Sequence, residues 1–181
     1  MMAAEIGQSA KVLRAKFVLK INKTCTKKMT MKPDFPSLLP PGRHLLTLAE
    51  LRNLTVPPFP DGGYRDKMFL RLEAWIQAIN NFGVHGTIWV DGSFLTQKPN
   101  PGDIDCVLWN PQTARPLSPA EQVSLQRLVN KPLAKSSYGL DFYLEVLANA
   151  DDTFHREAYW MGILGYAHDR KTAKGFAEVS I

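Results

Sequence analysis

The chain has 181 residues, of which 45% are hydrophobic and 22% are charged. This length allows one domain with an adequate core, and these fractions exclude disorder throughout the chain. No apolar run approaches the ~20 residues that a membrane-spanning helix needs. Cys25 and Cys106 lie far apart, so the sequence predicts neither a disulfide framework nor a zinc site. We therefore expect a protein of the reducing cytoplasm with no membrane partner.

The positive charge is concentrated at the N-terminus. The formal net charge is +5, but residues 1–30 contain seven Lys or Arg and one Glu, a balance of +6. Residues 31–181 therefore carry −1, which argues against a large basic groove for long nucleic acid. We interpret residues 1–30 as a basic N-terminal extension of a single domain, residues 31–181. Two interpretations stay open: an arm that contacts RNA or another anionic partner, or a disordered segment upstream of a natural start at Met31.

The first part of the domain predicts extended backbone followed by two helices. Residues 31–44 are rich in proline, so we expect them to run extended over the surface. Thr47 and Glu50 form a capping-box pattern, which predicts a short helix over 48–54. Apolar residues then recur at three- and four-residue steps, which predicts a helix over 64–82 whose apolar stripe belongs to the core.

The most informative stretch is TIWVDGSFLTQKPNPGDIDCVLW, residues 87–109. Its two apolar runs predict strands near 87–91 and 103–109, joined by a Gly-Ser turn and a polar loop. Side chains alternate faces along a strand, so Asp103 and Asp105 project together. Two carboxylates about 4 Å apart repel by ~4 kcal/mol at an effective dielectric constant near ~20. A folded chain keeps such a pair when a cation lies between them, and oxygen ligands beside phosphate suit Mg²⁺ or Mn²⁺.

The Gly-Ser turn supplies the other half of a site. Gly92 lets backbone N–H groups approach an anion closely, and free N–H groups at a strand-to-turn junction favour negative charge. Phosphate held by Gly92 and Ser93, opposite a metal on the two aspartates, predicts phosphoryl or nucleotidyl transfer. Lys98, between the two motifs, and Lys174, before the last strand, are further candidate phosphate contacts. A solvated role for each of these two lysines stays open.

The rest of the chain predicts alternating helices and strands. A capping box with proline at the first helical position predicts the next helix, and alternating apolar and aromatic residues predict the strand after it. The expected elements are a helix over 119–130, a loop over 131–139, a strand over 140–147, a helix over 153–164 and a strand over 176–181. This order predicts an α+β (α/β-like) domain, with a small mixed sheet flanked by helices.

Gly92-Ser93, followed by Asp103-Ile104-Asp105 between apolar runs, resembles the signature of the DNA polymerase β-type nucleotidyltransferase superfamily. The longer string WVDGSFLTQKPNPGDIDCVLW looks closest to small bacterial and phage members, mostly uncharacterised. The resemblance implies a nucleotidyltransferase fold and a third metal-site carboxylate on the strand beside the Asp103–Asp105 strand. Asp141, at the start of a strand, is our candidate, with Glu145 as the alternative. Asp103, Asp105 and Asp141 are thereby expected to hold Mg²⁺ or Mn²⁺ and to be the catalytic residues.

Two functional hypotheses follow from these motifs. In the first, the protein is an enzyme that transfers a nucleoside monophosphate from an NTP such as ATP to a hydroxyl, with release of pyrophosphate. The acceptor is a protein, an RNA 3′ end or a small molecule. In the second, the chain is a nucleotide-binding or partner-binding component of a toxin–antitoxin or phage-defence module, with little or no turnover. Its partner is then a cognate toxin or antitoxin protein.

Overall fold

The structure is a computed structural model that describes residues 34–60 and 63–181. The expectations for residues 1–30 lie outside this part of the chain. The strands are β1 (Gly42–Leu45), β2 (Val84–Asp91), β3 (Ile104–Thr113), β4 (Leu140–Glu145) and β5 (Gly175–Ser180). The helices are α2 (Leu48–Thr55), α3 (Tyr64–Asn80), α4 (Pro119–Leu128), α5 (Lys131–Tyr138) and α6 (Asp152–Leu164), with a 3₁₀ helix, η1 (Gly92–Leu95), after β2. None of the helices in the described ranges is long and apolar enough to cross a bilayer.

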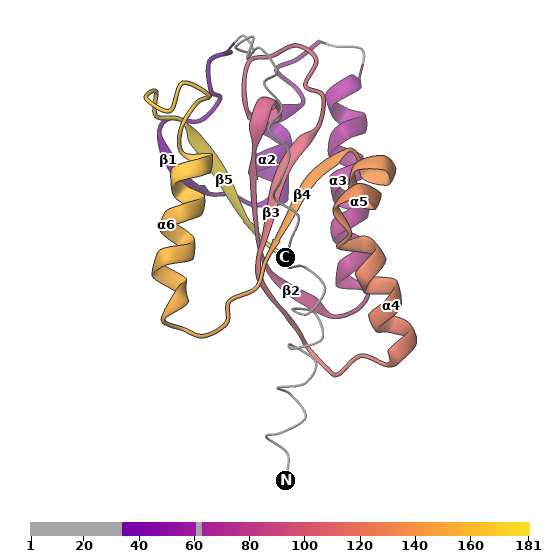
Figure 1. Cartoon of the computed structure of the whole chain (residues 1–181). Coiled ribbons are helices and arrows are strands. Elements are labelled where there is room, and N and C mark those ends of the chain that lie inside the picture. Colours follow the sequence, from indigo (N-terminus) through magenta and orange to yellow (C-terminus); the bar gives the residue numbers. More distant parts are fainter. Residues whose placement is uncertain (1–33, 61–62) are drawn as a thin grey trace, which may run out of the picture. The chain divides into compact units, whose positions relative to one another are not determined.

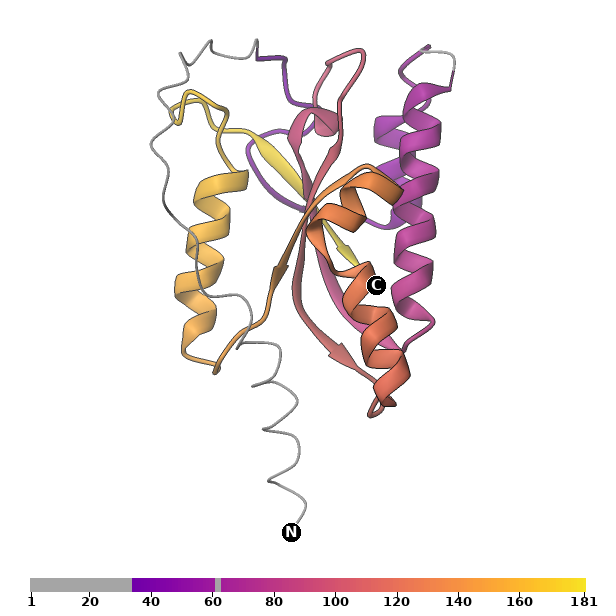
Figure 2. The same ribbon diagram turned by 45° about the vertical axis from the view of Figure 1, so that its right-hand side comes forward.

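The described strands form one mixed sheet in the order β1-β5-β2-β3-β4 (Figure 1). The edge strands β1 and β4 run parallel to their neighbours β5 and β3, whereas β2 runs antiparallel to both β5 and β3. Helices lie against both faces of this sheet, as Figure 1 and Figure 2 show. The predicted α+β class, a mixed sheet flanked by helices, is therefore confirmed.

The two faces of the sheet are covered differently. Helices α2, α3 and α5 pack on one face, where Trp75 and Phe69 of α3 are fully buried with Phe142 of β4 in the main core cluster. Helix α6 covers the other face, where Trp160 and its neighbours form a smaller cluster with Trp89 of β2. In Figure 2 this leaves α6 on one side of the sheet, with α3, α4 and α5 on the other. Each face of the sheet therefore has its own core.

Local signals predicted most of the elements well. In both α2 and α4 the full capping box is present: Thr47 and Ser118 accept from the backbone of Glu50 and Glu121, whose carboxylates accept in return. The periodicity in α3 also corresponds to its buried face, which includes Trp75.

Three expectations were wrong or incomplete. Residues 131–139, expected as a loop, contain α5. Asn130 is its N-cap residue, whose side chain accepts a hydrogen bond from the backbone N–H of Leu133, and Pro132 lies in the first turn. The extended segment expected over 31–44 contains a paired strand, β1, and the expected strand over 103–109 continues past Pro111 to Thr113. The physical reason for the missed helix is local: an asparagine cap and an early proline start a helix as well as a capping box does.

A buried arginine ties α3 to the loop that follows η1. The Arg65 side chain is 0% exposed, and its guanidinium donates to the backbone carbonyls of Phe94 at 2.8 Å, Thr96 at 2.8 Å and Lys98 at 2.7 Å. The Phe59 ring lies beneath it, with its centroid 3.6 Å from Cζ. A buried charge is tolerated when its donors are used in this way. Arg65 therefore fixes the loop between the Gly-Ser turn and β3.

Replacing this arginine tests how strongly it holds the loop. We expect Arg65→Ala to lower the free energy of unfolding by at least about 3 kcal/mol, because several buried carbonyls lose a charged donor. Urea unfolding measures the change. The exposed Arg127 of α4 provides the matched control, Arg127→Ala, which we expect to stay within about 0.5 kcal/mol of the parent. A loss below about 1 kcal/mol for Arg65→Ala would contradict this role.

Candidate functional site

Strand register brings acidic residues from β2, β3 and β4 into one row. Asp91, the last residue of β2, pairs with Asp105 of β3, and Asp105 pairs with Asp141 of β4. Directly paired residues point to the same face of a sheet. The end of β2 and the starts of β3 and β4 therefore place these carboxylates side by side. Asp103, which directly precedes β3, adds a further carboxylate to the group.

Burial and mutual repulsion act together on Asp105. Burial raises its pKa most, the negative charges of Asp103, Asp91 and Asp141 raise it further, and Lys174 lowers it, leaving a pKa of about 6. The ordinary value for an aspartate is about 4. The neighbouring carboxylates thus add to the effect of burial in disfavouring the charged form of Asp105.

Lysine side chains neutralise the other members of the row. The Lys174 ammonium donates to both carboxylate oxygens of Asp91 at 2.6 Å, in a pair that is almost buried. Lys131, at the start of α5, lies 2.7 Å from Oδ1 of Asp141.

One turn further along α5, Lys135 donates to Asp103 at 2.7 Å. Helix α5, absent from the expected elements, thus brings two cations to the site.

Gly92 makes room for the Asp105 carboxylate. Its φ of +79° lies in the left-handed region, and a Cβ at this position would be 1.7 Å from Oδ2 of Asp105. Only glycine fits both the backbone conformation and the space. The next residue, Ser93, closes the 3₁₀ turn, since its carbonyl accepts from the backbone N–H and Oγ1 of Thr96. The Gly-Ser turn therefore lies directly against the row of carboxylates.

Most of the residues expected at the site from the sequence lie together here. Asp103, Asp105 and Asp141 meet beside the turn, and Lys174 reaches the same place through Asp91. Lys98 contributes its backbone carbonyl to Arg65, and the described structure records no contact of its ammonium with the carboxylates.

Glu145, the alternative third carboxylate, lies apart from the row of aspartates and is buried in an ion pair. It is 8% exposed, accepts from Arg156 at 2.8 Å and from the indole N–H of Trp160 at 2.7 Å, and joins β4 to α6. Its position in β4 also lies opposite Trp109, away from the paired aspartates. Glu145 therefore has a structural role, and Asp141 is the carboxylate next to Asp105.

Three of the residues that surround the site were not among those predicted from the sequence. The sequence indicates only that Asp91 ends a strand. Its position directly before Gly92 could have marked it as a residue of the site. Lys131 and Lys135 are four residues apart, which places them on one face of a helix. That signal depends on first recognising the helix that begins after Asn130.

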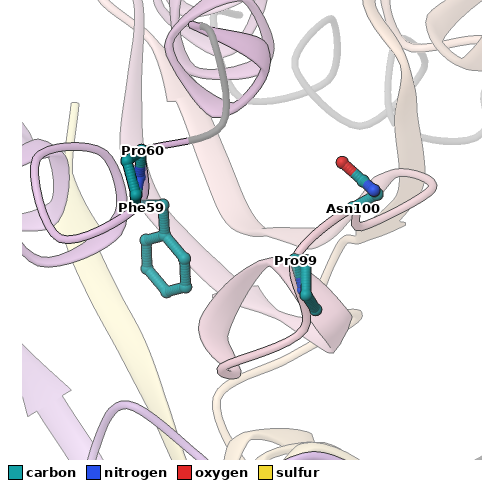
Figure 3. Close-up of a pocket in the computed structure, with 4 residues that line it drawn as sticks. All are labelled: Phe59, Pro60, Pro99 and Asn100. Carbon is teal, nitrogen blue, oxygen red and sulfur yellow. The ribbon is translucent and has the colours of Figure 1, made fainter.

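A hollow of about 360 Å³ lies near the loop between η1 and β3. Phe59 and Pro60 line one side, and Pro99 and Asn100 line the other (Figure 3). Among the described residues of this lining, none is titratable. The described part of the hollow therefore brings no carboxylate, and we assign the candidate chemistry to the row of carboxylates.

Comparison with known protein families identifies the family of this chain. Residues 33–180 match a family of unknown function, DUF6932. The chain belongs to this family. No curated protein and no solved structure matches the chain. The chemistry of this DUF6932 member is therefore inferred from its own residues.

The carboxylates of the row are the type of ligand that a hard divalent cation prefers. Carboxylate oxygens are the ligands that Mg²⁺ and Mn²⁺ prefer, and Oδ1 of Asp141 is buried without a well-aligned hydrogen bond, although Lys131 lies close to it. Within residues 34–60 and 63–181, no three His, Cys, Asp or Glu side chains are already arranged around one point. A cation on Asp103, Asp105 and Asp141 therefore requires these carboxylates to turn towards it and away from their lysines.

The raised pKa of Asp105 predicts how stability depends on pH. The unfolded chain loses this proton near pH 4 and the folded chain near pH 6. Between these values the folded state binds more protons, so stability falls as the pH rises. Ionisation of Asp105 lowers the free energy of unfolding by about 3 kcal/mol at pH 7, and by less than about 1 kcal/mol near pH 4.

We therefore expect Asp105→Asn to raise the free energy of unfolding at pH 7 by up to about 3 kcal/mol in metal-free buffer, and the gain to shrink towards pH 4. Urea unfolding across this pH range measures it. The control is Asp151→Asn, at an exposed position, which we expect to shift stability by less than about 0.5 kcal/mol at pH 7. A destabilised Asp105→Asn protein at pH 7 would contradict the expectation.

A methyl group at Gly92 tests the close approach of Asp105. We expect Gly92→Ala to lower stability by about 1–3 kcal/mol, because alanine is strained at this φ and its Cβ displaces the carboxylate. Mg²⁺ affinity, measured by calorimetry, should fall as well. Gly162→Ala is the matched control, since its Cβ meets open space in helix α6 and alanine favours a helix. If Gly92→Ala and the parent had equal stability and equal Mg²⁺ affinity, the position of the Asp105 carboxylate would not depend on this glycine.

Proposed function

We propose that the chain is a metal-dependent nucleotidyltransferase that moves a nucleoside monophosphate from an NTP to a hydroxyl acceptor. The observation that carries this proposal is the register of Asp105 with Asp141 beside Gly92, where a Cβ would overlap the Asp105 carboxylate. Carboxylates next to a glycine turn combine a cation site with a phosphate site. The strand, turn and strand that carry them agree with the nucleotidyltransferase fold that the motif implies.

Each residue then has a defined task. Asp103, Asp105 and Asp141 would hold Mg²⁺ or Mn²⁺, which would supply Lewis-acid stabilisation at the α-phosphate and make the acceptor hydroxyl more acidic. The backbone N–H groups of the Gly92–Ser93 turn, with Ser93 Oγ, bind the β- or γ-phosphate. The acceptor hydroxyl gives up its proton to solvent and its oxygen forms a bond to the α-phosphorus. The bond from that phosphorus to the oxygen that bridges to the β-phosphate breaks, and pyrophosphate leaves with that electron pair.

The lysines change partners in this scheme. When the carboxylates turn to a cation, the ammonium groups of Lys131 and Lys135 are released on the flank of the row next to α5. Lys174 instead bonds both oxygens of Asp91, the residue before Gly92, in an almost buried pair. We therefore assign Lys174 to positioning the turn, and Lys131 and Lys135 to neutralising phosphate.

The proposal predicts that carboxylates of the row are essential for transfer. Asp105→Asn and Asp141→Asn should each lower Mg²⁺-dependent transfer at least about 100-fold, because loss of one ligand removes charge stabilisation worth several kcal/mol. The measurement is incorporation of α-³²P-labelled NTPs into the protein and RNA fractions of a cell extract, with EDTA as a blank. Asp151→Asn, at the exposed N-cap position of α6, should retain full activity.

Two outcomes would contradict the proposal. The first is label transfer that survives in the Asp105→Asn, Asp141→Asn double variant. The second is NTP binding by the wild-type protein without transfer to any fraction, which would favour the alternative of a nucleotide-binding component in a toxin–antitoxin or phage-defence module.

A further inference from the structure

An exposed tyrosine follows the row of carboxylates along β4. Side chains alternate faces along a strand, so Tyr143 projects to the same face as Asp141, about 7 Å further along the strand. Its ring lies edge-to-face against that of Trp160 in α6, with the ring centroids 5.3 Å apart. The residue is nevertheless 40% exposed. Tyr143 therefore borders both the carboxylates and α6, and part of it stays open to solvent.

One ammonium group contacts both Tyr143 and Asp141. Nζ of Lys131 lies 2.7 Å from Oδ1 of Asp141 and 3.4 Å from the centroid of the Tyr143 ring. An ammonium over a ring at this distance forms a cation–π interaction. Lys131 thus covers one face of the ring while it neutralises the carboxylate. A metal cation on Asp141 would take over the ionic contact, and the ring face would then be available to another partner.

The order of the strands gives a direction to a bound nucleotide. β2 leads into Gly92, β3 carries Asp105 and β4 carries Asp141, and these strands are neighbours in that order. In the proposed function the pyrophosphate group lies at the Gly-Ser turn and the α-phosphate lies at the carboxylates. The nucleoside is joined to the α-phosphate and not to the pyrophosphate, which favours the β4 side of the row for the sugar and the base.

We propose that Tyr143 stacks on the base of the bound nucleoside triphosphate, in the place where the Lys131 ammonium lies. The inference rests on the proposed function, which gives the direction of the nucleotide. It assigns a contact to the base, whereas the Gly-Ser turn and the carboxylates act only on phosphates and metal. Stacking on an aromatic side chain strengthens binding by roughly 5- to 150-fold per base. Every base has a ring face, so we expect only a modest preference among bases.

The test compares two ligands that differ in the base. The α,β-methylene forms of ATP and of ribose 5-triphosphate cannot release pyrophosphate, and each is titrated into the protein with Mg²⁺ by calorimetry. The parent should bind the ATP form at least about fivefold more tightly than the form without a base. Tyr143→Leu should remove most of this difference and leave the affinity for the ribose form unchanged. Tyr143→Phe should keep the difference, because it keeps the ring.

Phe154→Leu is the matched control. Phe154 is an exposed aromatic residue in the first turn of α6, and its ring contacts that of His155. Its replacement should leave the affinities for both ligands unchanged.

The outcomes separate this inference from the proposed function. A contribution of the base that depends on Tyr143 supports the inference even if the wild-type protein transfers no label, in which case the proposed function alone fails. Equal affinities of the parent for the two ligands overturn the inference, whatever the substitutions do. An equal loss of both ligands in Tyr143→Leu gives the tyrosine a packing role and also overturns it. Parent-like binding of both ligands by Tyr143→Leu overturns it too, and label transfer by the wild-type protein would then leave the proposed function standing.

Discussion

The repulsion between carboxylates on neighbouring strands is the constraint on which the rest of this site depends. Register places Asp91, Asp105 and Asp141 side by side, and a sheet does not allow them to move apart without losing its backbone pairing. Cations relieve this repulsion, and the chain supplies them from both flanks: Lys174 from the segment before β5, and Lys131 from the start of α5. Asp105 lies between these ion pairs, and burial, together with the remaining repulsion, raises its pKa. The strand pairing thus fixes a group of negative charges in place, and this group favours the binding of positive charge.

The Gly-Ser turn is rigid for a different reason. A guanidinium that donates to several carbonyls of one loop fixes the path of that loop, because each carbonyl left without its donor would be buried and unpaired. Arg65 does this for the residues that follow η1, and it does so from α3, a helix packed into the main core. The turn is therefore held against Asp105 before any ligand arrives, and preorganised donors of this kind are what phosphate binding needs. A buried arginine in α3 thus contributes to the geometry of Gly92 without touching it.

The sequence predicted those features that depend on neighbours in the chain. Capping boxes and apolar periodicity are local, so α2, α3 and α4 could be placed within a few residues. The pairing of β1 with β5 joins Gly42 to Gly175, and no local pattern encodes a partner so distant. Glu145 was misjudged for the same reason, since its burial depends on Trp160 of a later helix. Lys135 was missed because its pairing with Asp103 exists only once α5 has formed.

Helix α5 supplies the counter-charges of two carboxylates in the row. Its first residue, Lys131, lies 2.7 Å from Asp141, and Lys135, one turn later, donates to Asp103. Eight helical residues span only about 12 Å, so both contacts belong to one short element that leads through Gly139 into β4. A cation held by Asp103 and Asp141 would take the place of both ammonium groups. The same carboxylates therefore either anchor α5 or hold a cation.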